Sequence, residues 1–192
     1  MTYAYKDVLD FWFEPPEAPG HGAQRQVWFS KDSRFDAEVR TRFAGLHETA
    51  ARGALADWEK APESLLALIV ALDQFPRNMY RGVAAAFATD GAALAAAKTM
   101  VRRGWDLGVQ PGMRMFVYLP YEHSEVLADQ DECMRLMARL GEDARFADLP
   151  KWAEKHHAVI RRFGRFPHRN AILGRASTPE EVEFLSQPGS AF

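Results

Sequence analysis

The sequence contains very little cysteine and no long hydrophobic run. Its single cysteine, Cys133, cannot form an internal disulfide, which is typical of a protein in a reducing cytoplasm. The longest apolar run, residues 65–72, is far shorter than the roughly 20 residues that a membrane-spanning helix needs. The first residues also lack the basic, apolar and small-residue regions of a signal peptide. We therefore expect a cytoplasmic protein with no membrane partner.

Long runs of one charge and low-complexity segments are missing too. The 192 residues include 24 basic and 26 acidic side chains, and 47% are hydrophobic, which suits one globular domain over 1–192 with a short tail from about 187. Residues 155–179 include no acid, whereas residues 122–148 are rich in acids. Such opposed blocks pair with each other more often than with a polyanion, so we expect no nucleic-acid partner.

The motifs of several enzyme classes are also missing. The sequence has no nucleotide-binding loop, no Gly-x-Ser-x-Gly elbow and no credible Cys–His pair, so no cofactor is predicted. Glu122 and His123 are adjacent and would point about 100° apart on a helix, which makes a shared metal ion difficult. No metal ligands are predicted, and metal-assisted hydrolysis is kept only as a second alternative function.

Hydrophobic residues recur at helical spacing along most of the chain, and no segment alternates as a strand would. Capping residues, prolines and glycines set the expected ends of each helix. We predict helices over about 3–13, 33–53, 62–75, 90–103, 120–140, 147–163 and 179–185, and a helical turn over 24–29 with Trp28 and Phe29 in the core. The fold class is therefore all-α, either a helical bundle or a tetratricopeptide-like stack of antiparallel hairpins.

The predicted helix 120–140 carries polar residues where its apolar face continues. Proline at the first helical position and Gly141 after the last apolar residue set its ends. At helical spacing, Glu122, His123 and Gln130 fall on or beside the stripe that holds Cys133. Buried charges and amides need partners, because leaving them unpaired costs several kcal/mol. We therefore expect other parts of the chain to meet these three side chains.

Two segments resemble each other: DQFPRN at 73–78 and RFPHRN at 165–170. Each contains Phe-Pro after an apolar helix, which predicts a rigid turn that ends the helix and aims arginine and asparagine side chains. The simpler interpretation is structural, since arginines after a helix can bond its last carbonyl groups. Arginine forks also match phosphate or carboxylate groups, so Arg77, Arg165 and Arg169 form a candidate anion site.

The motifs LDQFPRNMYRG, AFATD, YLPYEHSE and HHAVIRRFGRFPHRNAILGRAST resemble the bacterial domain-of-unknown-function family 924. The similarity extends from the first helix to the cap at Thr178. It implies an all-α tetratricopeptide-like fold but no established activity and no catalytic residue. Tyr121 stands where phenylalanine is expected, which keeps the aromatic character.

These patterns predict that the two turns and the start of helix 120–140 converge on one polar pocket for a small anionic or polar ligand. The candidate binding residues are Asp73, Gln74, Arg77, Asn78, Glu122, His123, Glu125, Arg165, His168, Arg169 and Asn170. If the protein is an enzyme, Glu122 or His123 is the candidate general acid or base. A buried network that only holds the helices in register would show the same pattern. The main alternative is a helical-repeat module that binds a peptide or protein.

Overall fold

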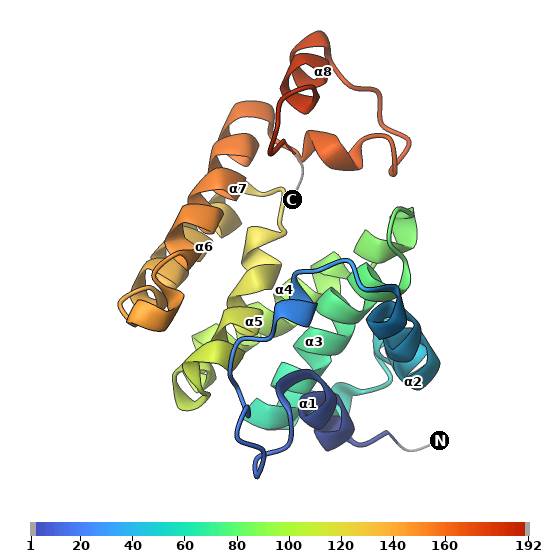
Figure 1. The fold of residues 1–192 in the computed structure, drawn as a ribbon, viewed down its shortest axis with the longest axis vertical. Coiled ribbons are helices and arrows are strands. Elements are labelled where there is room, and N and C mark those ends of the chain that lie inside the picture. Colours follow the sequence, from blue (N-terminus) through green and yellow to red (C-terminus); the bar gives the residue numbers. More distant parts are fainter. Residues whose placement is uncertain (1–2, 191–192) are drawn as a thin grey trace. The chain divides into compact units, whose positions relative to one another are not determined.

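The computed structural model describes residues 3–190, and within this range it contains helices and connecting loops but no strand. The prediction of an all-α fold is confirmed (Figure 1). The α-helices are α1 (Tyr5–Phe13), α2 (Ser33–Ala51), α3 (Pro62–Met79), α4 (Asp90–Arg102), α5 (Pro111–Glu122), α6 (Leu127–Leu140), α7 (Leu149–Phe163) and α8 (Pro179–Leu185). Short 3₁₀ helices are η1 (Gln26–Trp28), η2 (Ala56–Lys60), η3 (Ala84–Phe87), η4 (Trp105–Gly108), η5 (Ala144–Phe146) and η6 (Pro167–Arg169).

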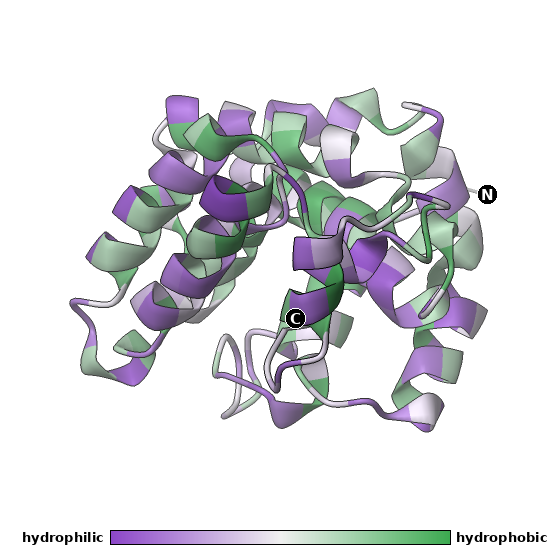
Figure 2. Ribbon diagram, turned by 90° about the horizontal axis from the view of Figure 1, so that it is seen from above, coloured by the Kyte–Doolittle hydropathy of each residue, from purple (hydrophilic) through white to green (hydrophobic). Residues whose placement is uncertain are grey.

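The chain divides into two compact units. Unit 1 comprises the chain up to Arg81 together with Ala85–Pro120, and unit 2 comprises Gly82–Ala84 together with the chain from Tyr121 onward. Hydrophilic and hydrophobic residues share the same helices in both units, as Figure 2 shows. Each helix can therefore bury one side while the other meets water. None of the helices in residues 3–190 is long and apolar enough to cross a membrane. The single-domain organisation stays a prediction.

Helix α3 is the centre of unit 1. Proline at its first position starts it as predicted, and α1, α2, α4 and η2 all pack against it. Its side chains are almost all buried, including Leu65, Ile69 and Phe75. The aromatic rings of Trp12 and Phe116 extend this core, with centroids 5.7 Å apart. Burial on all sides explains why the apolar residues of α3 form a broad face rather than a narrow stripe.

The predicted break of this helix at Phe75-Pro76 is wrong, since α3 continues to Met79. Proline lacks the N–H that would bond the carbonyl group of Leu72, and this loss normally ends or kinks a helix. Here the hydroxyl of Thr89 donates to the Leu72 oxygen at 2.6 Å instead. The helix therefore passes through Pro76 because a side chain from the start of α4 supplies the missing hydrogen bond.

The predicted single helix 120–140 is also wrong. Proline at position 111 starts α5, so Pro120 lies near its end, and α6 begins only at Leu127. Gln130 lies in the first turn of α6, and its side-chain amide caps the end of α5. Its Nε2 donates to the carbonyl oxygens of Glu122 and Ser124, both at 2.7 Å. Gln130 is fully buried because it satisfies the carbonyl groups at the end of α5.

Several smaller predictions have mixed outcomes. The capping box that starts α8 is confirmed at Thr178 and Glu181. Helix α2 begins at Ser33 as predicted, but Asp32 is the residue whose side chain caps it. Trp28 is buried, whereas Phe29, which was expected in the core, is 56% exposed. Three other side chains assigned to inward faces are exposed: Val126, Leu127 and Trp152.

Unit 2 is built on the pair α6 and α7, which pack against each other, and on α8, which packs against η6. Gly164 ends α7 in the left-handed conformation, with φ of 68°, where glycine has no steric penalty. Phe166, just after this glycine, packs with Val159 and Ile160 of α7 in a buried apolar cluster. The chain then turns through η6 and a loop to α8, and the arginines of this segment form two ion pairs with glutamates of unit 2.

Candidate functional site

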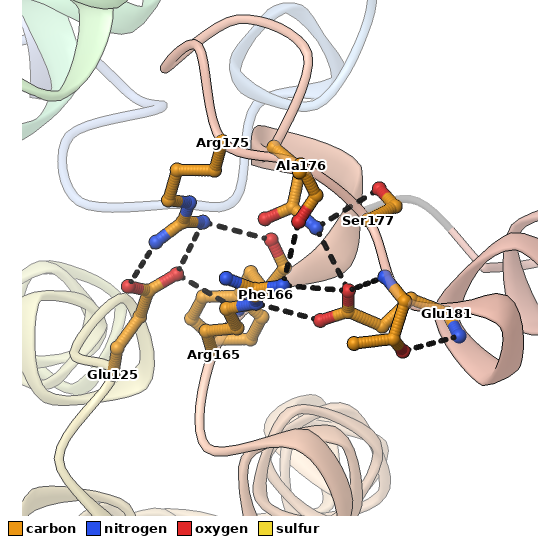
Figure 3. Close-up of polar contacts among 9 residues, drawn as sticks. Glu125, Arg165, Phe166, Arg175, Ala176, Ser177 and Glu181 are labelled. Atoms are coloured by element: carbon orange, nitrogen blue, oxygen red, sulfur yellow. Dashed lines mark hydrogen bonds and ion pairs between the residues drawn. The ribbon is translucent and has the colours of Figure 1, made fainter.

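Two ion pairs fix the segment that contains RFPHRN, and Figure 3 shows both. In the first, Arg175 donates to both carboxylate oxygens of Glu125, at 2.8 and 3.0 Å. The same carboxylate accepts the backbone N–H of Phe166 at 2.7 Å, and Arg175 also donates to the Phe166 carbonyl oxygen. Burial opposes ionisation of Glu125, but Arg175 and this N–H outweigh it, so the pKa of the carboxyl is lowered.

The second ion pair joins Arg165 to Glu181, with N–O distances of 2.6 and 2.7 Å. Glu181 also accepts the amide of Asn170 at 3.2 Å and the backbone N–H of Thr178 at 2.8 Å. Arg165 is the main cause that lowers the pKa of this carboxyl to about 2. Arg165, Asn170 and Glu125, all predicted as ligand-binding residues, therefore hold the loop in place.

Phe166, enclosed by these ion pairs, is fully buried and carries three polar neighbours on its ring. The guanidinium carbon of Arg169 lies 4.5 Å from the ring centroid, in cation–π geometry. The ring of His168 is tilted against it at 5.6 Å, and the ring of His156 approaches edge-on at 5.7 Å. One apolar ring thus brings together a guanidinium and two imidazoles.

His156 projects from α7 and is 7% exposed. Its Nδ1 lies 2.9 Å from the carbonyl oxygen of Trp152 and 3.5 Å from Oε1 of Glu122, which is itself 6% exposed. Burial is the main cause that lowers the pKa of His156 to about 3 and that of His168 to about 4, and the charge of Arg169 contributes to both shifts. Both imidazoles are therefore neutral at neutral pH.

The other predicted residues of unit 2 lie near this group. His123 is half-buried just after α5, close enough to lower the pKa of both His156 and His168. Cys133 of α6 is fully buried, and burial together with the charge of Glu122 raises the pKa of its thiol. The thiol thus stays protonated at neutral pH, which agrees with its predicted role as a core residue.

The predicted residues of unit 1 form a separate group at the end of α3. Arg77 donates to both oxygens of Asp90, at 2.8 and 3.0 Å, and lies 3.3 Å from Oδ1 of Asp73. Gln74 donates to the other oxygen of Asp73. Asn78 points elsewhere and donates to Asp36, at 2.8 Å. The convergence of these residues with those of unit 2 in one pocket stays a prediction.

The chain matches the model of a family described as a bacterial protein of unknown function, DUF924, over residues 8–189. The chain belongs to DUF924. A solved structure of a protein of unknown function from Agrobacterium tumefaciens, ATU0120, is similar to it, with 42% identity and a TM-score of 0.85. The similarity covers 95% of this chain and 96% of that one. No match was found among curated proteins.

Sequence analysis of this DUF924 chain missed the partners of its own candidates. The contact between His156 and Glu122 was not predicted, nor was the ion pair between Glu181 and Arg165. Arg175 was not among the predicted site residues. The sequence did hold one signal for Glu181, which is its place as the third residue of a helix. An acid there caps the helix, and its second oxygen can also bond an arginine from elsewhere in the chain.

Residues that hold a metal ion in other proteins are present but not grouped. Within residues 3–190 of this DUF924 chain, no three histidine, cysteine, aspartate or glutamate side chains are placed to share an ion. The side chains around Phe166 can supply hydrogen bonding, positive charge from Arg169 and proton exchange at neutral imidazoles.

Proposed function

We propose that unit 2 binds a small anionic ligand at the group formed by Arg169, His156 and His168 around Phe166. The observation that carries this proposal is the stacking of the Arg169 guanidinium on one buried ring beside two neutral imidazoles, inside a loop held by two bidentate ion pairs. Rigid support of this kind keeps donors in place without a ligand and lowers the entropic cost of binding one.

The three side chains suit an acidic group for different reasons. A guanidinium can donate two parallel hydrogen bonds to a carboxylate or phosphate, and its stacking on Phe166 limits the directions in which those donors point. The neutral imidazoles each carry one N–H donor and one acceptor nitrogen. Since Arg169 is 7% exposed, its attraction for an anion is screened less than that of a surface arginine.

Calorimetric titration with inorganic phosphate and with succinate tests the proposal. Wild-type protein should bind at least one of them, and Arg169→Met should weaken that binding at least tenfold, since a charge-assisted hydrogen bond contributes about 1.5–3 kcal/mol. Arg162→Met is the matched control, because Arg162 is exposed and also stacks on a phenylalanine, Phe163, at 4.6 Å. Loss of binding in both variants, or no binding by wild type, would contradict the proposal.

A second candidate function is peptide binding by unit 1, in the manner of tetratricopeptide-like helical hairpins. A groove of about 240 Å³ favours it, lined by small residues such as Ala51, Ala92 and Ala95 from α2 and α4. Small side chains let a peptide backbone approach closely. If this groove is used, helical peptides selected against wild-type protein should lose binding to Ala95→Phe, and binding that survives this substitution would argue against it.

We also propose that the protein works in the reducing cytoplasm. The proposal is supported by the single cysteine, Cys133, whose thiol is buried. Fractionation of bacterial cells that express the tagged chain tests it. The chain is expected in the cytoplasmic fraction, and recovery with periplasmic proteins would contradict the proposal.

A further inference from the structure

Helix α7 carries a line of positive charge on its exposed side. The residues of this line, which we call the α7 stripe, are Lys151, Lys155, Ala158 and Arg162. They recur every three or four residues, so they share one side of the helix, and all of them are exposed. Buried Ile160 marks the side that packs into the apolar cluster of unit 2. At the rise of an α-helix, the stripe is about 16 Å long.

Trp152 lies beside the stripe and is 50% exposed. Nζ of Lys155 lies over its ring, 4.1 Å from the centroid, in cation–π geometry. The indole therefore keeps apolar area in water that a partner could cover. Tryptophan and arginine are enriched among the residues that contribute most to protein–protein binding, and here both types occur on one exposed helix.

Two cations of the stripe differ from other basic residues of unit 2 in having no acidic partner. Arg165 and Arg175, from the same basic segment of the sequence, each form an ion pair with a glutamate. Among residues 3–190, no carboxylate forms an ion pair with Lys155 or Arg162, and both cations lie over aromatic rings instead. Their charges can therefore meet an acidic group from another molecule.

A narrow partner suits this surface better than a broad polyanion. The chain has a net charge of −2, and exposed acids flank the stripe, namely Asp148, which pairs with Lys151, and Glu154. A nucleic acid or an anionic membrane would meet these carboxylates together with the cations, and the repulsion would offset part of the attraction. A single helix, about 10 Å wide, can lie along the stripe alone.

We propose that the α7 stripe binds an acidic helix of a partner protein, with an apolar side chain of that helix packed against Trp152. Carboxylates two turns apart on the partner helix can pair with Lys155 and Arg162, which are seven residues apart. Each exposed cation is screened by salt and gains little from a small anion, whereas a helix that meets both cations adds their contributions. The proposal does not rest on the anion site around Phe166.

Fluorescence anisotropy with a labelled peptide tests the proposal. The peptide is a helix of about four turns with glutamates along one face and a leucine beside them, and a second peptide has glutamine in place of each glutamate. Wild-type protein should bind the acidic peptide and should bind the glutamine peptide about tenfold more weakly. Raising the salt concentration from about 50 to about 300 mM should also weaken binding of the acidic peptide.

Substitutions at exposed positions show where the peptide binds. Lys155→Gln and Arg162→Gln should each weaken binding about threefold and together about tenfold, and Trp152→Ala should weaken it about tenfold. Arg139→Gln is the matched control, because Arg139 is an exposed cation of α6 outside the stripe, and it should leave the affinity unchanged. Ala95→Phe, which fills the groove of unit 1, should also have no effect. Thermal unfolding checks that each variant is folded.

Several outcomes would overturn the proposal. These are no binding of the acidic peptide by wild-type protein, equal losses in Arg139→Gln and Arg162→Gln, and loss of binding in Ala95→Phe, which would place the peptide in unit 1. A single-stranded RNA oligonucleotide and phosphatidylserine vesicles are measured in parallel. If either binds more tightly than the peptide and depends on Lys155 and Arg162, the stripe serves a polyanion and the proposal is wrong. Succinate and phosphate binding is measured separately, so the proposed function can fail without this proposal.

Discussion

The two Phe-Pro segments, 73–78 and 165–170, share phenylalanine, proline, arginine and asparagine but have different backbones. In unit 1 the first remains inside α3, and Arg77 is neutralised by Asp73 and Asp90. In unit 2 the second follows a left-handed glycine and forms η6, so its side chains diverge. Arg165 pairs with Glu181, and Arg169 stacks on Phe166 beside neutral imidazoles. Similar residues thus build a helix end in one unit and a candidate binding group in the other.

The two backbones differ because different side chains support the chain around each proline, which has no backbone N–H to donate. In α3 the hydroxyl of Thr89 bonds the carbonyl oxygen of Leu72, and the helix continues. After α7 the helix has already ended at Gly164, and ion pairs from Glu125 and Glu181 support the next turn. The backbone conformation at a Phe-Pro pair is therefore set by side chains from distant parts of the sequence and not by the pair itself.

The largest expected effect on the free energy of unfolding comes from removing the ion pair that holds the unit 2 segment. Arg165→Ala leaves the Glu181 carboxylate, 2% exposed, without its arginine, and a carboxylate shielded from water is destabilised when its cation is removed. Urea unfolding should show this loss in the free energy of unfolding. Arg161→Ala, at an exposed position of α7, should change it by less than about 0.5 kcal/mol. Equal effects of the two substitutions would show that the Glu181 pair has no structural role.

A smaller effect on the free energy of unfolding is expected when the pH is lowered below neutral. The pKa of His156 is lowered to about 3 in the folded chain, against an ordinary value of 6.5, so the unfolded chain binds the extra proton between these values. Stability is therefore highest above pH 6.5 and falls as the pH is lowered toward 3, by at most about 1.4 kcal/mol per pH unit for this group. His156→Gln should flatten the dependence measured by urea unfolding at pH 7, 6 and 5. An unchanged slope would show that His156 is not buried as a neutral ring.

The role of Thr89 in unit 1 is tested by a substitution whose expected effect on stability is smaller. Thr89→Val keeps the shape but removes the hydroxyl, which leaves the Leu72 oxygen without its bond and should cost about 1–3 kcal/mol. Pro76→Ala restores a backbone N–H at the right position. The double variant should therefore be more stable than Thr89→Val alone, as measured by thermal unfolding. Additive losses would contradict the exchange of one donor for the other.

The smallest effect is expected at the exposed arginine next to the first segment. Arg81 pairs with Asp36 at 2.6 Å, but its side chain is 37% exposed. Arg81→Gln should lower the free energy of unfolding by about 0–1 kcal/mol, with a smaller change in high salt. A loss as large as that of Arg165→Ala would remove the contrast between the two units.

Local signals predicted much of the fold. Proline at 62, Gly53 and the Thr178–Glu181 box set helix ends without reference to distant parts, and each was placed correctly. Position 120 was misread because two prolines, at 111 and 120, could each start a helix. The choice depends on Gln130 capping α5, a contact that no local pattern reveals.

The candidate site was predictable only in part, for the same reason. Burial of Glu122 followed from helical spacing, and Arg169 and Asn170 followed from turn chemistry. The partners that fix the loop, such as Arg175 with Glu125, are separated by 50 residues in the chain. Such pairs depend on the tertiary fold, so spacing and composition give no indication of them.

The central claim is that two neutral imidazoles and Arg169 lie around Phe166 and together bind an anion. Long-range ¹H–¹⁵N NMR of the histidine rings at pH 7, during titration with succinate, measures this directly. We predict a neutral His156 with its proton on Nδ1, a neutral His168, and shifts of both rings with succinate that disappear in Arg169→Met. Protonated rings at pH 7, or rings that do not respond to succinate or phosphate, would contradict the account.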